Sequence, residues 1–285
     1  MILKREIAIE GKKYCVVLSD ERETLLAAKA AGRVLVGILG SGDEDLSPAR
    51  YLVETPECAD ERYLERVVRR EMGLPWIIAE SKRLILREFT MEDLAQIPGE
   101  GESEADRVFY TEELLKAYIR GQYGFYEYGM WAVVRREDGR IIGKAGVSDC
   151  DIRRDLAAAS VSAPDLAAVS APGAAPVSVL GAAPALSAAP VPAADLSDAS
   201  VSAPEMRLEL GYHIFAPYRR QGYAEEACRM VLDYTIEEYG CPVYAVTEQS
   251  NLPSIRLLEK LGFRAEERKY SEAAPQHYLC WRYWR

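Results

Sequence analysis

Leu208-Glu-Leu-Gly-Tyr-His-Ile-Phe215 predicts a β-strand, and the turn Ala216-Pro-Tyr-Arg-Arg-Gln-Gly-Tyr-Ala224 separates it from a helix over residues 225–239. The helix is predicted because small and apolar side chains recur every three or four residues from Ala224 onward, as one stripe that faces a sheet. Gly240 and Pro242 then end it. The region is therefore a strand, a glycine-containing turn and a helix in direct succession.

This turn is suited to bind an anion. A strand that leads through a turn into a helix N-terminus directs several unpaired N–H groups, and the positive end of the helix dipole, to one point. Gly222 permits a close approach of the backbone to an anion, and Ala224 keeps the second turn position small. The pattern predicts a phosphate site.

The turn resembles a known motif. Arg219-Arg-Gln-Gly-Tyr-Ala224 matches the Arg/Gln-x-x-Gly-x-Gly/Ala signature of the GNAT superfamily of N-acetyltransferases, whose loop holds the pyrophosphate of acetyl-CoA. The resemblance implies acetyl-CoA as co-substrate. It implies that the cofactor-binding residues include Arg219, Arg220, Gln221, Gly222, Tyr223 and Ala224.

The flanking sequence extends the resemblance from Arg83 to Arg285. Downstream lie an apolar strand, Val243 to Thr247, and the segment Asn251-Leu-Pro-Ser-Ile-Arg-Leu-Leu-Glu-Lys-Leu-Gly-Phe263. Upstream, residues 82–94 are similar to the opening strand and first helix of the family, and residues 131–134 and 141–147 to its central hairpin. The resemblance implies a mixed α/β fold with a central, mostly antiparallel sheet flanked by helices.

Two short segments point to one branch of the superfamily. Glu209-Leu-Gly-Tyr212 and Glu225-Glu-Ala227 are most similar to enzymes that acetylate the N-termini of ribosomal proteins. The implied reaction moves an acetyl group to a primary amine of a peptide or protein N-terminus, or of a small molecule, by direct attack in a ternary complex. The alternative is an acyl-CoA-binding or regulatory module without turnover.

The resemblance also assigns roles beside the loop. The backbone of Ile214 and Phe215 is expected to hold the pantetheine arm and to polarise the thioester carbonyl, and Asn251 and Ser254 to hydrogen-bond the cofactor arm. Helix capping is the alternative interpretation for Asn251 and Ser254, and for Ser254 the two interpretations are equally good.

Glu209 is the candidate general base, because on an alternating strand it projects opposite to Leu208 and Leu210. A solvated face is the alternative. The tyrosine that the family often carries as general acid is replaced by Leu258. Ser254 is therefore a candidate catalytic residue. A bound water or an unassisted thiolate are alternatives, and the other candidate donors are Tyr212, Tyr270, Tyr278, His213 and His277.

The sequence predicts two further units. Residues 1–75 form a small α/β lobe, whose segment from Leu18 to Leu39 resembles part of a haloacid-dehalogenase-like domain without its Asp-x-Asp strand, and residues 76–285 form the acetyltransferase domain. Residues 155–204 are Ala, Ser, Pro, Val and Leu-rich, with no aromatic residue, and predict a disordered insertion in a β-hairpin. One further hypothesis has the lobe binding a nucleotide or phosphate compound.

Composition excludes several function classes. A net charge of -10 and a pI near 5.0 argue against a nucleic-acid partner. No apolar run is long enough for a membrane span, so we expect no membrane partner and a cytoplasmic protein. The six cysteines form no CxxC pair and there are two histidines, so no metal is predicted. The resemblance to the acetyltransferases implies an amine acceptor as partner, and a homodimer is left open.

Overall fold

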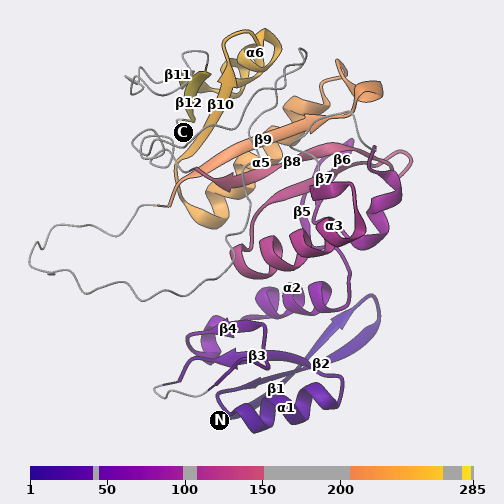
Figure 1. The fold of residues 1–285 in the computed structure, drawn as a ribbon, viewed down its shortest axis with the longest axis vertical. Helices are drawn as coiled ribbons and strands as arrows, with labels where there is room; N and C mark the ends of the chain where they lie inside the picture. Colours follow the sequence, from indigo (N-terminus) through magenta and orange to yellow (C-terminus); the bar gives the residue numbers. More distant parts are fainter. Residues whose placement is uncertain (41–44, 99–107, 151–205, 266–277, 284–285) are drawn as a thin grey trace, which may run out of the picture.

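The computed structural model describes residues 1–40, 45–98, 108–150, 206–265 and 278–283, and the side chains of these residues except 278–280. These residues form two β-sheets, one of four strands and one of eight (Figure 1). The four-stranded sheet uses residues 2–53, and the eight-stranded sheet begins at Ile77. The predicted insertion, residues 155–204, lies outside the described residues.

The N-terminal lobe consists of a four-stranded sheet and the helices that connect its strands or follow them. Its elements are β1 (Ile2–Ile9), β2 (Lys12–Ser19), α1 (Arg22–Ala30), β3 (Val34–Ile38), β4 (Tyr51–Val53), η1 (Pro56–Cys58) and α2 (Glu61–Glu71). β1 and β2 are antiparallel, whereas β2, β3 and β4 are parallel. The apolar runs at residues 14–18, 34–39 and 51–53 predict strands, and the patterns at 21–31 and 60–72 predict helices. These elements are present as β2, β3, β4, α1 and α2.

β1 was not predicted, because charged residues interrupt its apolar pattern. It is an edge strand of the sheet, where one face and one edge are open to water, so Lys4, Arg5 and Glu6 are exposed without cost. Glu10 and Gly11 both have positive φ, 50° and 79°, which is the backbone that a two-residue hairpin turn requires.

The second sheet has the order β11-β12-β10-β9-β8-β7-β6-β5. Its strands are β5 (Ile77–Glu80), β6 (Leu84–Arg87), β7 (Met130–Arg135), β8 (Ile141–Asp149), β9 (Leu208–Ile214), β10 (Val243–Glu248), β11 (Phe263–Ala265) and β12 (Tyr278–Tyr283). All neighbours are antiparallel except β9 and β10, which are parallel. The predicted mixed α/β fold with a mostly antiparallel sheet is confirmed.

Helices and turns connect these strands. They are η2 (Met91–Gln96), α3 (Glu112–Tyr118), the π-helix η4 (Ile119–Tyr126), η6 (Ala216–Tyr218), α5 (Tyr223–Tyr239) and α6 (Leu252–Leu261). Where the sequence predicts a first helix before Leu94, the structure has the short 3-10 helix η2, whose start is fixed by a capping box between Thr90 and Asp93. None of the described helices is long and apolar enough to cross a membrane.

The strands that flank the insertion pair with each other. β8 and β9 are antiparallel, from Gly143 opposite Ile214 to Asp149 opposite Leu208. The predicted hairpin is therefore confirmed at its base. This pairing matters for the site, because β9 leads directly into the anion-binding turn.

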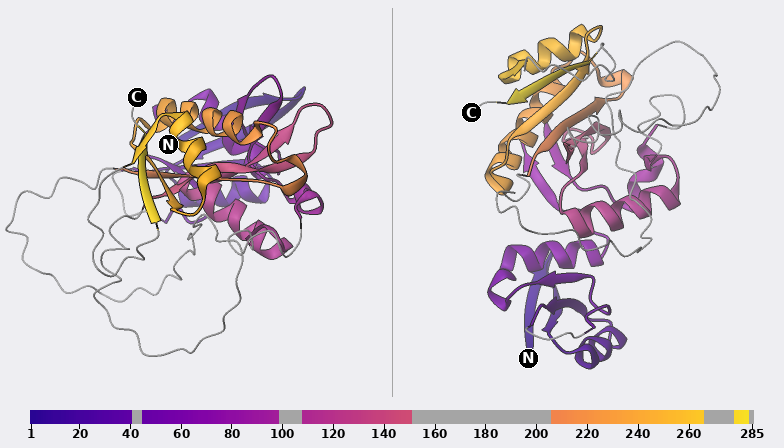
Figure 2. Two further views of the ribbon diagram at one scale, coloured as in Figure 1. Left: turned by 90° about the horizontal axis from the view of Figure 1, so that it is seen from above. Right: turned by 60° about the vertical axis from the view of Figure 1, so that its left-hand side comes forward.

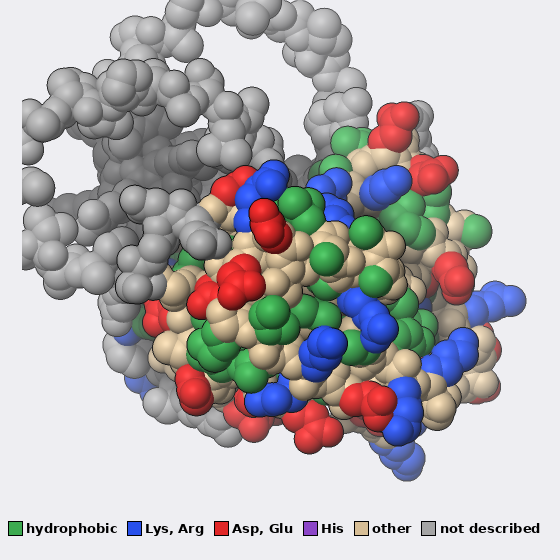
Figure 3. Space-filling model, turned by 90° about the horizontal axis from the view of Figure 1, so that it is seen from below, with side chains coloured by type: hydrophobic (Ala, Val, Ile, Leu, Met, Phe, Trp, Pro, Cys, Tyr) green, Lys and Arg blue, Asp and Glu red, His purple; other side chains and the backbone are tan. Residues whose placement is uncertain are grey.

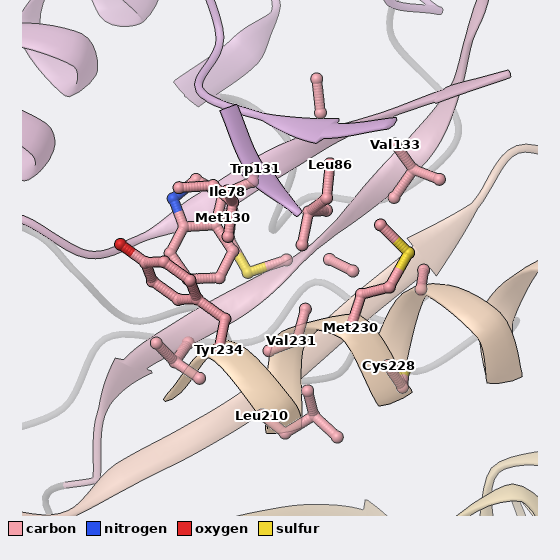
Figure 4. Packing of buried hydrophobic residues seen from close by; sticks show 14 of the residues in the cluster. Ile78, Leu86, Met130, Trp131, Val133, Leu210, Cys228, Met230, Val231 and Tyr234 are labelled. Atoms are coloured by element: carbon pink, nitrogen blue, oxygen red, sulfur yellow. The ribbon is translucent and has the colours of Figure 1, made fainter. Parts of the chain in front are cut away.

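The main core lies between the eight-stranded sheet and α5. The apolar stripe of α5 packs on β5, β6, β8 and β9, and Figure 4 shows Val231 and Tyr234 of α5 against Leu86 and Trp131 of the sheet. The rings of Trp131 and Tyr234 meet edge to face at 5.4 Å between their centroids. The core fixes α5, and with it the turn at its N-terminus.

The lobe docks on the larger domain through α2, which lies between the two sheets (Figure 2). Arg70 of α2 makes a bidentate ion pair with Glu88, and both side chains are 3% exposed. Arg66, at 8%, bonds to Glu127 at 2.7 Å and to Glu238 at 3.2 Å. Each buried cation thus faces carboxylates of the other domain.

Removal of one partner of this buried pair will destabilise the protein. We expect Glu88→Ala to lower the free energy of unfolding by about 3–5 kcal/mol, because Arg70 is left buried without its counter-charge. Urea denaturation followed by tryptophan fluorescence measures the change. Glu65→Ala, which removes a carboxylate from a more exposed pair on α2 itself, is the control and should cost less than about 1 kcal/mol. Equal losses in the two variants would contradict this account of the interface.

Candidate functional site

The two central strands of the large sheet separate along their length. β9 and β10 pair only from Val243 opposite Leu208 to Tyr244 opposite Glu209. Beyond this point, the edge of β9 from Leu210 to Ile214 has no described strand beside it on the β10 side. Its backbone groups on that edge can hydrogen-bond a bound molecule that lies between the strands.

β9 leads into the turn before α5. Gly222 is the N-cap of α5 with φ +80°, and Arg220 also has positive φ, +61°. The first backbone bond of the helix runs from the Glu226 amide to the Gly222 carbonyl at 3.2 Å. Within the described residues, the amides of residues 220–225 donate to no backbone or side-chain acceptor. The turn therefore presents a row of N–H donors at the positive end of a 17-residue helix.

Arginine side chains hold this turn from both sides. Arg219 Nε donates to the Ile214 carbonyl at 2.7 Å, and its Nη2 lies 2.8 Å from His213 Nε2. Arg83 Nη1 donates to the Gln221 carbonyl at 3.0 Å, and the Arg83 guanidinium lies 4.6 Å from the centroid of the Tyr223 ring. Arg83 comes from the loop between β5 and β6, so it ties the turn to the far half of the sheet.

The two carboxylates in the first turn of α5 are turned to cations. Glu225 accepts from Lys260 at 2.5 Å and from Arg229 at 3.2 Å, and the Lys260 hydrogen bond holds the pKa of Glu225 below its ordinary value. Glu226 accepts from Ser81 and from Arg83 Nε, both at 2.7 Å. These negative charges are therefore neutralised, and do not repel an anion at the turn.

α6 starts beside the opening between β9 and β10. Asn251 Oδ1 accepts from the Ser254 amide at 3.2 Å, so Asn251 caps α6. The Ser254 hydroxyl is 2.7 Å from the Tyr212 hydroxyl of β9, and Ser254 is buried. Burial raises the pKa of Tyr212 well above its ordinary value, so the phenol stays neutral.

Glu209 lies where β9 and β10 part, since it forms the last pair before the separation. Its neighbours Leu208 and Leu210 are buried toward α5 (Figure 4 labels Leu210), so Glu209 projects to the other face. Its Oε1 is shielded from solvent. Its carboxylate is therefore partly desolvated, in contrast to the alternative of a solvated face.

A narrow cleft lies on this same face of the sheet. It is lined by Phe89, Ile97, Pro98, Phe109, Tyr110, Lys144 and Phe215. Lys144 is 4% exposed, and its Nζ lies 4.5 Å from the centroid of the Phe109 ring. Lys144 is opposite His213 in the β8–β9 register, so its side chain shares a face with that of Glu209. The cleft is the candidate acceptor side.

The structure brings most predicted site residues together and leaves others apart. The backbone of Ile214 and Phe215 is engaged, because Ile214 accepts from Arg219 and the Phe215 amide donates to Ile142 at 2.9 Å. Leu258 is 1% exposed in the core. Tyr270, His277 and the side chain of Tyr278 lie outside the described residues. Arg83 and Glu226 were not predicted, because no local pattern links positions 143 residues apart.

The described part of the chain contains no cluster of side chains that could bind a metal ion. No group of three His, Cys, Asp or Glu side chains lies close enough to hold an ion there.

The segment that forms this site is similar to part of known proteins. Residues 192–264 match the family model of the acetyltransferase (GNAT) domain, a range that holds β9, the turn, α5, β10 and α6. Over 63 residues the chain is 33% identical to an uncharacterised N-acetyltransferase, YnaD, of Bacillus subtilis (strain 168). That match covers 22% of this chain and 37% of the relative, so the chain spans little more than a third of the curated protein it matches.

Solved structures of acetyltransferases are also similar. One is a putative GNAT-family acetyltransferase from Bordetella pertussis, with 18% identity, 72% of this chain and 98% of that chain covered, and a TM-score of 0.44. Another is a ribosomal-protein-S5-alanine acetyltransferase from Vibrio fischeri, with 15% identity, 73% and 95% covered, and a TM-score of 0.43.

Loss of the Arg83 side chain will loosen the turn. We expect Arg83→Ala to speed hydrogen–deuterium exchange of residues 226–229, the first hydrogen-bonded amides of α5, by about fivefold, which corresponds to about 1 kcal/mol of lost charge-assisted hydrogen bonding. Arg136→Ala, which removes a comparably exposed arginine paired with Glu80, is the matched control and should leave this peptide unchanged. Unaltered exchange in Arg83→Ala would show that the turn is held by its own backbone.

Proposed function

We propose that this chain is an acetyl-CoA-dependent N-acetyltransferase. The observation that carries the proposal is the row of free amides at the N-terminus of α5, placed directly beside the opening between β9 and β10. A diphosphate fits the amides, and an extended arm fits the edge of the strand. The match of residues 192–264 to the acetyltransferase (GNAT) domain supports the same assignment.

We assign the residues around the turn and along β9 to parts of acetyl-CoA from their contacts in the structure. The amides of Gln221, Gly222, Tyr223 and Ala224 bind the pyrophosphate, with Arg220 beside them, and Arg219 holds the turn to β9. From the pyrophosphate, the pantetheine arm passes Ile214 and Phe215 and follows the free edge of β9 toward Leu210. Because these two residues already use one backbone group each, we place the thioester contacts earlier on the edge, from Leu210 to Tyr212. Asn251 caps α6 and thereby positions the Ser254 hydroxyl at the arm.

The chemistry requires an unprotonated amine and a stabilised thiolate. The amine nitrogen attacks the thioester carbon, the C–S bond breaks, and the proton released by the nitrogen goes to Glu209, on the acceptor face of the sheet. The amine is a peptide or protein N-terminus or a small molecule.

Tyr212 and Ser254 act on the leaving sulfur. A phenol with a raised pKa is a poor proton donor to a thiolate, because thiols titrate near pH 8.5. It is, however, a good neutral hydrogen-bond donor. We propose that the Tyr212–Ser254 pair stabilises the thiolate by hydrogen bonding, which fills the place left by Leu258.

The first experiment is a calorimetric titration with acetyl-CoA, followed by a thiol-release assay with peptides and small amines. We expect binding and release in the wild type and no binding in Gly222→Asp, since the new carboxylate meets the pyrophosphate. Gly222→Ala is the control for backbone strain at φ +80°, and should keep measurable binding. Binding without release across the panel would favour the non-catalytic module, and absent binding would refute the proposal.

The catalytic roles predict different losses. We expect Glu209→Gln to lower kcat by about 10²–10⁴-fold with unchanged acetyl-CoA affinity, as for removal of a general base. Tyr212→Phe should lower kcat by about tenfold, as for one lost hydrogen bond to the leaving group. The exposed substitution Glu259→Gln is the control for a carboxylate change. Wild-type kcat in Glu209→Gln would remove Glu209 from the mechanism.

A further inference from the structure

A second cavity lies at the seam between the lobe and η4. It has a volume of about 310 Å³, and its lining is Lys29, Arg33, Leu35, Pro48, Arg50, Tyr51, Glu71 and Arg120. The first seven residues belong to the lobe, and Arg120 belongs to η4 of the larger domain. Both domains therefore contribute to the lining, the larger one through Arg120.

The lining is strongly basic in a protein with a net charge of -10. It has four cations and one carboxylate, Glu71, which lies 3.7 Å from Arg50. Within the described part of the chain, Lys29, Arg33 and Arg120 take part in no ion pair. The lobe end as a whole is mixed in charge, with acidic, basic and hydrophobic side chains next to one another (Figure 3). The concentration of unpaired cations is therefore local.

The base of the cavity is organised by Arg50 and Tyr51. The Arg50 guanidinium donates to the Arg120 carbonyl and lies against Gly124, where a Cβ would come within 2.8 Å of Arg50 Cζ. Below it, Tyr51 is 3% exposed, and its hydroxyl has no hydrogen-bond partner in the described residues. Burial raises the pKa of Tyr51 to about 12, so it is a neutral donor at neutral pH. The lining thus combines cations of both domains with a buried, neutral tyrosine.

This cavity is remote from the turn at Gly222. The Tyr239 hydroxyl, at the C-terminal end of α5, donates to the Glu127 carbonyl directly after η4 at 3.2 Å. Gly222 lies at the other end of the same 17-residue helix, which is about 25 Å long. An anion in the cavity is therefore distinct from one bound at the N-terminus of α5.

We infer that the cavity binds a small phosphate monoester and that the ligand links the lobe to η4. Guanidinium groups donate paired N–H bonds that match phosphate oxygens, and the volume suits a molecule of sugar-phosphate size. Because Lys29 and Arg33 come from one domain and Arg120 from the other, the bound phosphate holds the two domains together. Binding therefore stabilises the docked arrangement.

Calorimetry on the full chain tests the site, with glucose 6-phosphate and inorganic phosphate as probes at constant ionic strength. We expect saturable binding in the wild type, and a Kd at least about tenfold higher in Lys29→Gln/Arg33→Gln and in Arg120→Gln. Lys4→Gln/Arg5→Gln is the matched control, since it removes two exposed, unpaired cations from the same lobe. It should bind as the wild type does.

The Gly222→Asp variant separates this site from the proposed acetyl-CoA site, because it should bind both probes with wild-type affinity. Loss of binding in that variant would place the phosphate at α5 and overturn the inference. So would the absence of saturable binding, an equal loss in the Lys4→Gln/Arg5→Gln control, or wild-type affinity in Arg120→Gln. Binding of citrate in place of both phosphates would refute the phosphate assignment.

Discussion

The early end of the parallel pairing between β9 and β10 is the constraint on which the site depends. After Tyr244 and Glu209 the two strands no longer hydrogen-bond, so the sheet opens at its centre. The opening leaves a strand edge free and places Glu209 at its closed end. It also lets the chain leave β9 into the turn before α5, so that the free edge and the free helix amides adjoin. A fully paired sheet would have satisfied these backbone groups itself.

α5 connects the anion-binding turn to the opposite side of the larger domain. Its apolar stripe packs on four strands, its N-terminus forms the anion-binding turn, and its C-terminal end reaches Glu127 after η4. Arg83 at one end and Arg66 near the other bond to carboxylates of the helix, Glu226 and Glu238. The same helix therefore positions the proposed cofactor site and anchors the lobe.

The lobe is held by buried charge more than by apolar contact. Arg66 and Arg70 project from α2 into carboxylates of the larger domain, and the two hydrophobic clusters of the lobe contain lobe residues alone. Such an interface is specific, since each buried arginine needs its own partner, but it adds less stability than an apolar contact of equal area. This balance makes the docked state sensitive to a ligand that bonds to both domains.

The sequence by itself determined the features that depend on near neighbours. The stripe of α5, the glycine turn at Gly222, the cap at Asn251 and the strands that flank the insertion all follow from spacing over a few residues, because helix and strand periods and turn conformations are local. Tertiary structure alone decided which distant groups meet: Arg83 with Glu226 across 143 residues, Tyr212 with Ser254 across 42, and Arg50 with Arg120 across 70. No local period encodes such pairs. They exist because the sheet order and the docking of α2 place their backbones within reach, and burial then selects the partners that satisfy charge and hydrogen bonding.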